Sequence, residues 1–387
     1  MSKTSLMMVA GERSGEVYGG ALASALQARA DVQIFGCGGE AMRQAGVETT
    51  VDAREFAMVG LTEVLSGLPR AYGAFNRLLK EVDRRKPRLA VLIDSPSLNL
   101  RLAKHLKRRN IPVVYFVSPQ IWAWKKWRIR QIRERVAKML CIFDFEEEIY
   151  RRAGVPVEYV GHPLVDLVES KLTRQEFFAQ ADLDPDVPTV AFLPGSREKV
   201  VRFNLPAMLD CASRLALKRK IQFVVAVAPS LDPAWMESRL LDCYVGRATI
   251  RTVTGATVEA LRYSTLAVVA SGTATVVAML AECPIIVVYR VSPISWQLGK
   301  VLVDVPFYSM VNLLAKKPVV PELMQDDFMA GPLAERCERL LDEAPARDEM
   351  VKEFRALRLR LGPGGAIERA AQAVLEVLQP ASVEARG

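Results

Sequence analysis

Short runs of Val, Ile and Leu recur along the chain, and segments with helix-like spacing of apolar residues separate them. Runs without polar alternation are typical of strands buried on both faces, as in parallel sheets covered by helices. The runs that we expect to form strands are 6–10, 32–35, 89–93, 113–117, 139–143 and 157–160 in the first half, then 189–193, 223–227, 249–253, 266–270 and 285–289. The pattern predicts an α/β protein.

A more charged segment, 168–188, separates the two halves and ends in turn-forming residues. We place the domain boundary there, with a first domain over 1–170 and a second over 187–340. Each half then forms a doubly wound, Rossmann-like domain. Ligands of such domains bind beyond the carboxyl ends of the strands, so we expect a site in a cleft that the two domains face.

The composition and net charge narrow the class of protein and the kinds of partner that we expect. Of the 387 residues, 50% are hydrophobic and 25% charged, the balance of an ordered globular chain. The net charge of +8 favours phosphorylated small molecules, acidic lipid surfaces or nucleic acid. Six scattered cysteines without a Cys-x-x-Cys pair argue against a zinc site or a disulfide framework and indicate a reduced cytoplasm. No stretch approaches the ~20 apolar residues of a membrane span, so any membrane contact is expected to be peripheral.

Two features of the first half are candidates for chemistry. The first strand runs into a helix on which glycines 11, 15 and 19 share a face, which suits either close packing on the sheet or approach to a ligand. Asp94 directly follows a buried run, where a general base would point into the cleft, although an Asp there also caps turns. The chain has two histidines, His105 and His162, and both are weaker candidates for the general base than Asp94.

Two turns of the second half share a phosphate-binding pattern. Gly195-Ser196-Arg197 and Ser271-Gly272-Thr273 each follow a strand and precede a helix start, whose N–H groups suit an anion. Arg197 adds a bidentate phosphate partner. Either turn alone could be a plain N-cap, but together they predict a diphosphate site. The sequence offers no metal site, because Asp184-Pro185-Asp186 lies in the inferred linker and reads as a turn.

Two further segments could contact larger partners. Basic and aromatic residues alternate over 122–138, which suits single-stranded nucleic acid, an anionic lipid or simply a solvated helix. An apolar stripe at helical spacing predicts either a core helix face or a membrane interface. Its members include Leu61, Leu65, Leu68, Tyr72 and Phe75.

A series of short motifs runs from the first strand to about Gln325. The motifs begin at Val9 (VAGERSGE), Val59 (VGLTEVL), Ile93 (IDSPSLN), Val117 (VSPQIWAW), Gly161 (GHP), Leu193 (LPGSR), Ala270 (ASGTA), Tyr289 (YR) and Asn312 (NLL). In type and order this series resembles that of the lipid-A-disaccharide synthase family, and the Gly-Glu-x-Ser-Gly and Ser-Pro-x-x-Trp-Ala-Trp segments are the most specific.

The resemblance implies a GT-B glycosyltransferase that is inverting, metal-independent and without a cofactor. It would move 2,3-diacylglucosamine from its UDP donor to the 6-hydroxyl of 2,3-diacylglucosamine 1-phosphate, making the lipid A disaccharide 1-phosphate and UDP. It would work as a peripheral protein on the cytoplasmic face of the inner membrane, without nucleic acid, and the family allows a homodimer. The helices of 341–387 would cross back to the first domain or exchange between subunits.

The resemblance also assigns residues. Asp94 matches the family's proposed base, and Arg197 would assist the leaving group. The donor would be bound by Gly195, Ser196, Arg197, Ser271, Gly272, Thr273 and Asn312. The acceptor would be bound by Gly11, Glu12, Ser14, Gly15, Ser118 and Trp122, and the acyl chains or membrane by the apolar stripe.

This chain departs from the family's pattern at two carboxylates. Val200 and Val277 stand where the family usually has Glu, which puts the donor's affinity in question. Glu16 for Asp, and Ser97 where a second Asp can occur, are milder changes. Two alternatives therefore stay open: another GT-B UDP-sugar enzyme, such as a GlcNAc transferase or an epimerase, and a non-catalytic paralogue that binds anionic membranes or nucleic acid.

Overall fold

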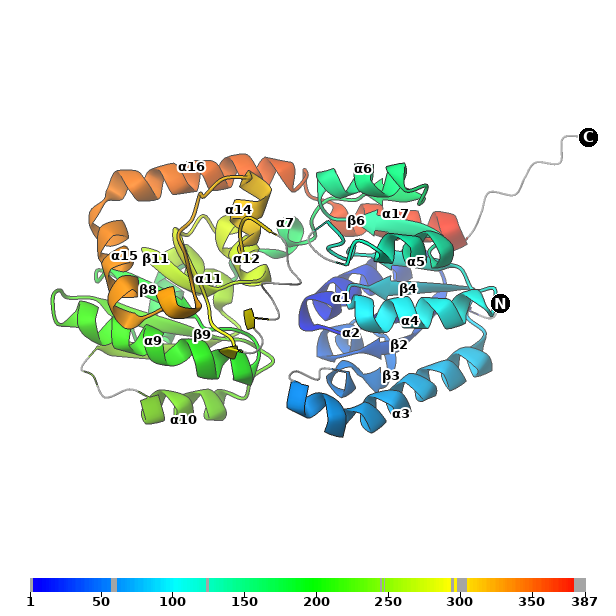
Figure 1. The fold of residues 1–387 in the computed structure, drawn as a ribbon, viewed down its shortest axis with the longest axis horizontal. Coiled ribbons are helices and arrows are strands. Elements are labelled where there is room, and N and C mark those ends of the chain that lie inside the picture. The colour runs from blue at the N-terminus through cyan, green and yellow to red at the C-terminus, as the bar shows by residue number, and fades with distance from the viewer. Residues whose placement is uncertain are drawn as a thin grey trace, which may run out of the picture. The chain divides into compact units, whose positions relative to one another are not determined.

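The computed structural model describes residues 3–56, 61–122, 125–243, 246, 248–293, 296–297 and 305–378, without the side chains of 61–68. The chain divides into two compact units. Unit 1 holds the residues up to Pro163 together with those from Leu361 onward, and unit 2 runs from Leu164 to Arg360. Each unit is a parallel sheet covered by helices (Figure 1).

The sheet of unit 1 has the strand order β3-β2-β1-β4-β5-β6-β7, and every neighbouring pair is parallel. Its strands are β1 (Thr4–Ala10), β2 (Val32–Gly38), β3 (Glu48–Asp52), β4 (Leu89–Ile93), β5 (Val113–Phe116), β6 (Lys138–Cys141) and β7 (Val157–Tyr159). All five residues of β4 are buried, as expected for a strand covered on both faces. The hydrophobic runs missed β3, because this edge strand is mostly polar.

Helices follow the strands of unit 1. They are α1 (Arg13–Gln27), α2 (Glu40–Gln44), α3 (Leu61–Arg85), α4 (Pro96–Lys107), α5 (Arg128–Arg135) and α6 (Asp144–Arg152), with the short η1 (Ala53–Glu55) before α3. A last helix, α17 (Ala366–Leu378), returns to this unit and packs on α1. Its buried face is rich in alanine, and Arg369 Nε donates to the Val160 carbonyl at 2.9 Å.

The sheet of unit 2 has the order β10-β9-β8-β11-β12-β13 and is also parallel. Its strands are β8 (Thr189–Leu193), β9 (Gln222–Val227), β10 (Thr249–Thr254), β11 (Leu266–Ala270), β12 (Ile285–Tyr289) and β13 (Glu322–Met324). Its helices include α7 (Leu164–Leu167), α8 (Arg174–Gln180), α9 (Glu198–Ala216), α10 (Pro233–Cys243), α11 (Thr257–Tyr263), α12 (Thr273–Leu280), α14 (Met310–Ala315), α15 (Ala330–Asp342) and α16 (Ala344–Arg360), with η2 (Gln325–Asp327) after β13.

The division between the units differs from the sequence-based boundary. The segment before β8 packs on unit 2: the buried Glu259 accepts a hydrogen bond from the Lys171 N–H at 2.6 Å, and the Tyr263 hydroxyl donates to the Leu172 carbonyl at 2.7 Å. Its charges therefore mark a docked segment rather than a free linker. At the other end, α16 stays with unit 2, so 341–387 divides at Leu361.

None of the helices in the described part of the chain is both long and apolar enough to cross a membrane.

Candidate active site

Asp94 lies on a tightly held turn at the carboxyl end of β4. Asp94 and Ser95 have φ of 50° and 43°, in the left-handed region that non-glycine residues rarely occupy. The Asn99 side-chain amide donates to the Asp94 carbonyl at 2.8 Å and to the Ile93 carbonyl at 2.9 Å, and the Tyr115 hydroxyl donates to the Asp94 carbonyl at 2.5 Å. These bonds hold the main chain of the turn in place.

The next strand ends in the same way. Val117 directly follows β5 and has φ of 65°, a strained value for a β-branched residue. The Asp94 N–H donates to the Phe116 carbonyl at 3.0 Å, which fixes the ends of β4 and β5 side by side. The turns that carry Asp94 and Ser118 are therefore neighbours at the carboxyl edge of the sheet, where doubly wound domains bind ligands.

Gly11 brings the turn after β1 against the same edge. A Cβ placed on Gly11 would lie 2.7 Å from Ser95 Oγ, so only glycine allows this approach. Ser95 is 8% exposed, and its hydroxyl has no hydrogen-bond partner among the described residues. Glu12 then stands at the N-cap position of α1, and Ser14 and Gly15 lie in its first turn. The predicted acceptor residues thus gather at the ends of β1, β4 and β5.

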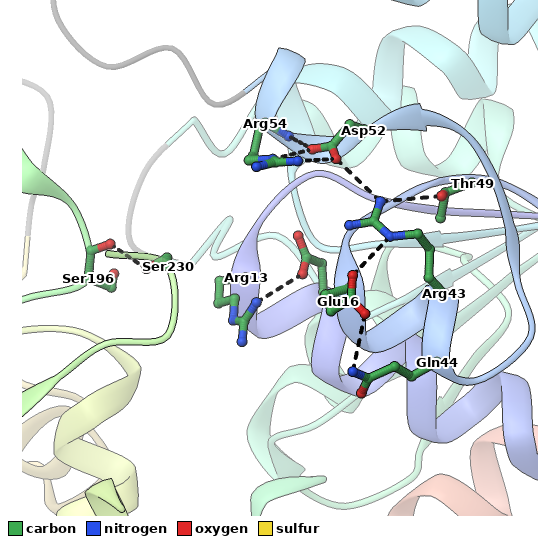
Figure 2. A network of polar contacts seen from close by, with 10 residues as sticks. Arg13, Glu16, Arg43, Gln44, Thr49, Asp52, Arg54, Ser196 and Ser230 are labelled. Atoms are coloured by element: carbon green, nitrogen blue, oxygen red, sulfur yellow. Dashed lines mark hydrogen bonds and ion pairs between the residues drawn. The ribbon is translucent and has the colours of Figure 1, made fainter. Parts of the chain in front are cut away.

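Paired charges line the ends of β1 to β3 (Figure 2). Glu16 is 7% exposed and lies 3.5 Å from Arg13 Nη1, and burial raises the pKa of its carboxyl. Asp52 accepts two hydrogen bonds of 2.9 Å from the Arg54 guanidinium and one of 3.3 Å from Arg43, which lower the pKa of Asp52 to about 2. This corner of unit 1 is therefore a set of matched ion pairs.

Sequence analysis did not single out Glu146, which is buried behind two of the predicted acceptor residues. Ser118 Oγ donates to Glu146 Oε1 at 2.6 Å, and Trp122 Nε1 donates to the same oxygen at 3.2 Å. Glu146 is 1% exposed. It stands in the first turn of α6 among other carboxylates, so no pattern in the sequence distinguished it.

His162 lies in the loop after β7 and is buried among aromatic rings. Its ring centroid lies 5.3 Å from that of Phe143 and 6.4 Å from that of Tyr18, and burial lowers the pKa of His162 to about 3. The imidazole is therefore neutral at physiological pH.

Residues of the apolar stripe on α3 differ in exposure. Tyr72 is 66% exposed, whereas Phe75 is 8% exposed and packs edge-on against His105, with ring centroids 5.5 Å apart. Phe75 therefore belongs to the core of unit 1, which corrects the expectation of a membrane contact there. The side chains of Leu61, Leu65 and Leu68 lie outside the described residues.

In unit 2, Gly195 forms the turn between β8 and α9. Its φ is 134°, and a Cβ placed there would lie 2.7 Å from Val200 Cγ1. Val200 thus packs behind the turn, while Ser196 and Arg197 are exposed in front of α9. The Ser230 hydroxyl donates to the Ser196 carbonyl at 2.7 Å (Figure 2).

A second turn lies beside the first, because β8 and β11 are neighbours in the sheet. The Ser271 hydroxyl donates to the Tyr308 carbonyl at 2.7 Å, and Gly272 and Thr273 are exposed at the start of α12. Two helix starts with exposed N–H groups therefore share one edge of the unit 2 sheet, which suits a diphosphate.

Asn312 has a different place from the one expected. It is 1% exposed; its amide donates to the Val320 carbonyl and to Glu322 at 2.9 and 2.8 Å, and its oxygen accepts from the Val319 and Val320 N–H groups. Glu322 in turn accepts from the Tyr308 N–H at 2.9 Å. Because the Asn312 amide is satisfied internally, it supports the segment that holds Ser271 rather than reaching a ligand directly.

Among the described residues, no three His, Cys, Asp or Glu side chains are grouped closely enough to hold a metal ion. The Asp186 N–H donates to Asp184 Oδ1 at 2.9 Å, as in an Asx turn.

Comparison with known proteins now adds to this geometry. The family described as lipid-A-disaccharide synthetase matches residues 6–376. The chain belongs to this family. It is 42% identical to the lipid-A-disaccharide synthase of Solibacter usitatus (strain Ellin6076) over 376 residues, 97% of each chain. It is 44% identical to that of Koribacter versatilis (strain Ellin345) over 380 residues, 97% of this chain and 98% of the relative.

Solved structures agree on the two-domain α/β fold. A UDP-GlcNAc 2-epimerase from Neisseria meningitidis bound to UDP-GlcNAc matches with a TM-score of 0.66 at 11% identity, over 96% of this chain and 100% of that one. CalG4, the calicheamicin glycosyltransferase, matches with a TM-score of 0.61 at 14% identity, over 99% of this chain and 100% of that one. At these identities the likeness shows the GT-B architecture alone. Family membership favours the synthase over the epimerase and non-catalytic alternatives.

Proposed function

We propose that this lipid-A-disaccharide synthase family member transfers 2,3-diacylglucosamine from its UDP donor to the 6-hydroxyl of 2,3-diacylglucosamine 1-phosphate. The products are the β-linked lipid A disaccharide 1-phosphate and UDP. Family membership supports the reaction. The observation that carries the mechanism is the position of Asp94, a carboxylate at the carboxyl end of β4 on a turn whose main chain is held by Asn99 and Tyr115.

Asp94 acts as the general base in this mechanism. The acceptor oxygen attacks the anomeric carbon of the donor from the face opposite UDP, and the hydroxyl proton passes to the Asp94 carboxylate. One displacement of this kind inverts the anomeric centre. The rigid turn keeps the carboxylate in place without reorganisation, which is what a general base requires.

Unit 2 stabilises the leaving group. As the bond between the anomeric carbon and the phosphate oxygen breaks, negative charge gathers on the diphosphate. Arg197 and the N–H groups at the starts of α9 and α12 are donors of the kind that stabilises such charge. These residues include Gly195, Ser196, Ser271, Gly272 and Thr273, with Asn312 in support. Because they supply positive potential, we propose that the reaction needs no metal ion.

The acceptor sugar binds to unit 1 in this proposal. Gly11, Ser118 and Trp122 come from turns at the ends of β1 and β5, on either side of Asp94. Glu12, Ser14 and Gly15 extend this surface along the start of α1. Both substrates carry acyl chains, so we propose peripheral binding to the cytoplasmic face of the inner membrane and no role for nucleic acid. A homodimer stays a prediction for sedimentation analysis.

The decisive experiment offers the purified protein UDP-2,3-diacylglucosamine and UDP-GlcNAc as alternative donors, with the acylated acceptor. We expect UDP release and a disaccharide product only with the diacylated donor. Consumption of UDP-GlcNAc instead, with transfer or epimerisation of that sugar, would support the other GT-B enzymes. A protein that releases UDP from neither donor would contradict the proposal.

A further inference from the structure

A buried carboxyl stands behind the loop that follows β5. Glu146 is the third residue of α6, and one of its oxygens, Oε1, accepts hydrogen bonds from Ser118 Oγ at 2.6 Å and Trp122 Nε1 at 3.2 Å. The other oxygen, Oε2, faces the Phe143 N–H at 3.4 Å. Buried carboxylates are uncommon unless such donors surround them.

Helix capping explains only half of this arrangement. The part that a helix cap explains is the hydrogen bond that the Phe143 N–H donates to Glu146. This bond uses only one oxygen of the carboxyl, Oε2. The next carboxylates of α6 behave as surface residues do: Glu147 lies 3.0 Å from Arg151 Nη2, and Glu148 lies 2.7 Å from the neighbouring Arg152. Glu146 instead commits an oxygen to two side chains of another segment.

That segment needs support from outside. It begins just after Val117, whose left-handed φ is unfavourable, and its first turn lies beside Asp94. Strained backbone persists where its surroundings hold it. Helix α6 provides a second contact, because the Tyr150 hydroxyl donates to the Pro119 carbonyl at 3.4 Å.

We infer that Glu146 is a positioning residue, which in its ionised form holds Ser118 and Trp122 in the arrangement that binds the acceptor sugar. The inference rests on the proposed function, which assigns these two residues to the acceptor. The ionised form suits this arrangement best because Trp122 Nε1 and the Phe143 N–H are donors only, they face opposite oxygens, and a carboxylate accepts more strongly than a neutral carboxyl. A carboxylate accepts on both sides.

The surroundings make this arrangement sensitive to pH. Burial raises the pKa of Glu146 to about 7, against the opposing effect of the hydrogen bonds from Ser118 and Trp122. The titratable groups that its charge affects are Cys141 at the end of β6 and Tyr150 on α6, and burial and then the Glu146 charge raise the pKa of both. As the pH falls through about 7, Glu146 gains a proton and the loop loses an acceptor.

The first test is Glu146→Gln, measured by steady-state kinetics with each substrate varied. An amide must turn its NH2 group toward either Trp122 or Phe143, so one donor loses its partner. We expect the KM for the acceptor to rise by about tenfold while the KM for the donor stays within about twofold. In the wild type, the acceptor KM should rise as the pH falls below about 7, and this dependence should disappear in Glu146→Gln. Glu148→Gln, on the exposed side of the same helix, should match the wild type.

A second variant keeps the inference testable if Glu146→Gln fails to fold. Trp122→Phe keeps an aromatic ring beside Phe145 and removes the donor to Glu146, so it should raise the acceptor KM in the same direction. In the double variant the two effects should not add, because both break one hydrogen bond.

An unchanged acceptor KM and pH profile in folded Glu146→Gln, or in Trp122→Phe, would overturn the positioning role. Failure of the proposed function would look different, because the wild type itself would then release no UDP from the acylated donor.

Discussion

The side-chain amide of Asn99 bonds to the main-chain oxygen of Asp94 at 2.8 Å, across the first turn of α4. Asn99 is fully buried, and the same NH2 group also reaches the Ile93 carbonyl. This amide therefore holds the backbone of the turn that carries Asp94. Variants of Asp94 therefore test the carboxylate, whereas variants of Asn99 test the turn.

Asp94→Asn changes the carboxylate alone. Asn tolerates the left-handed region as Asp does, and the bonds from Asn99 and Tyr115 go to the main chain, so the fold should persist. Loss of a general base should lower turnover by about 10²- to 10⁴-fold with UDP binding unchanged. Single-turnover kinetics and UDP titration check this.

Asn99→Ala is the matched comparison, since it should lower both thermal stability and turnover. Turnover of Asp94→Asn within a few-fold of the wild type would show that Asp94 only caps the turn.

Arg197 tests the leaving-group mechanism. Arg197→Ala removes one donor to the developing diphosphate charge and should cost about 2 to 4 kcal/mol of transition-state stabilisation, measured from kcat/KM. Chelation with EDTA should leave wild-type activity intact. Activity that disappears on chelation and returns with magnesium would refute metal independence. Arg202→Ala, on the same helix α9 but paired with Glu198 at 3.7 Å, is the control.

Val277→Glu asks whether a missing carboxylate limits donor binding. Val277 is half-buried in α12, four residues after Thr273. A carboxylate there could accept a ribose hydroxyl bond, and an unmade hydrogen bond costs about 1 to 3 kcal/mol. We expect UDP to bind more tightly to the variant by calorimetry. Weaker binding would mean that another residue already contacts the ribose.

The sequence predicted the strands well because their physical signal is local. A strand covered on both faces is a continuous apolar run, and β4, β8 and β11 are buried at every position. The edge strand β3 and the packing of the segment before β8 were not predicted, because the polar residues there bind partners far along the chain. Glu259, for example, lies 88 residues from Lys171.

The candidate site could be predicted only where its chemistry lies in motifs. Asp94 and the two glycine turns are readable because strand, turn and helix follow one another directly. Glu146 and Glu322 are not, because their roles depend on which segments fold against them. For Phe75 the sequence predicted an apolar helix face but not what covers it. Helical spacing identifies such a face without telling whether protein or membrane lies against it.

His162 makes stability depend on pH. Its pKa is about 3 in the folded protein and about 6.5 when unfolded, so the unfolded chain binds an extra proton between these values. The stabilisation is complete above about pH 6.5 and decreases as the pH falls toward 3. Between pH 6.5 and 5 the free energy of unfolding should fall by about 2 kcal/mol more in the wild type than in His162→Gln, measured by urea denaturation. Equal slopes for the two proteins would contradict this.

Membrane binding is tested best on the exposed part of α3. Tyr72 is 66% exposed and Arg70 is exposed beside it, so Tyr72→Ser with Arg70→Ser should leave the fold intact. An aromatic residue beside a cation suits an anionic bilayer interface, and the chain's net charge of +8 adds long-range attraction. We expect the double variant to sediment less with anionic vesicles and to turn over acylated substrates more slowly.

Leu65→Ser with Leu68→Ser extends the test to the start of the same helix, and Leu217→Ser is the control, because Leu217 is 85% exposed on unit 2. Each buried methylene contributes about 0.8 kcal/mol, so losing two leucines from a bilayer contact should weaken vesicle binding far more than losing Tyr72. If the leucine variant instead unfolds, and Tyr72→Ser with Arg70→Ser binds vesicles as the wild type does, α3 is a core helix. The acylated substrates would then have to be reached from another surface of the protein.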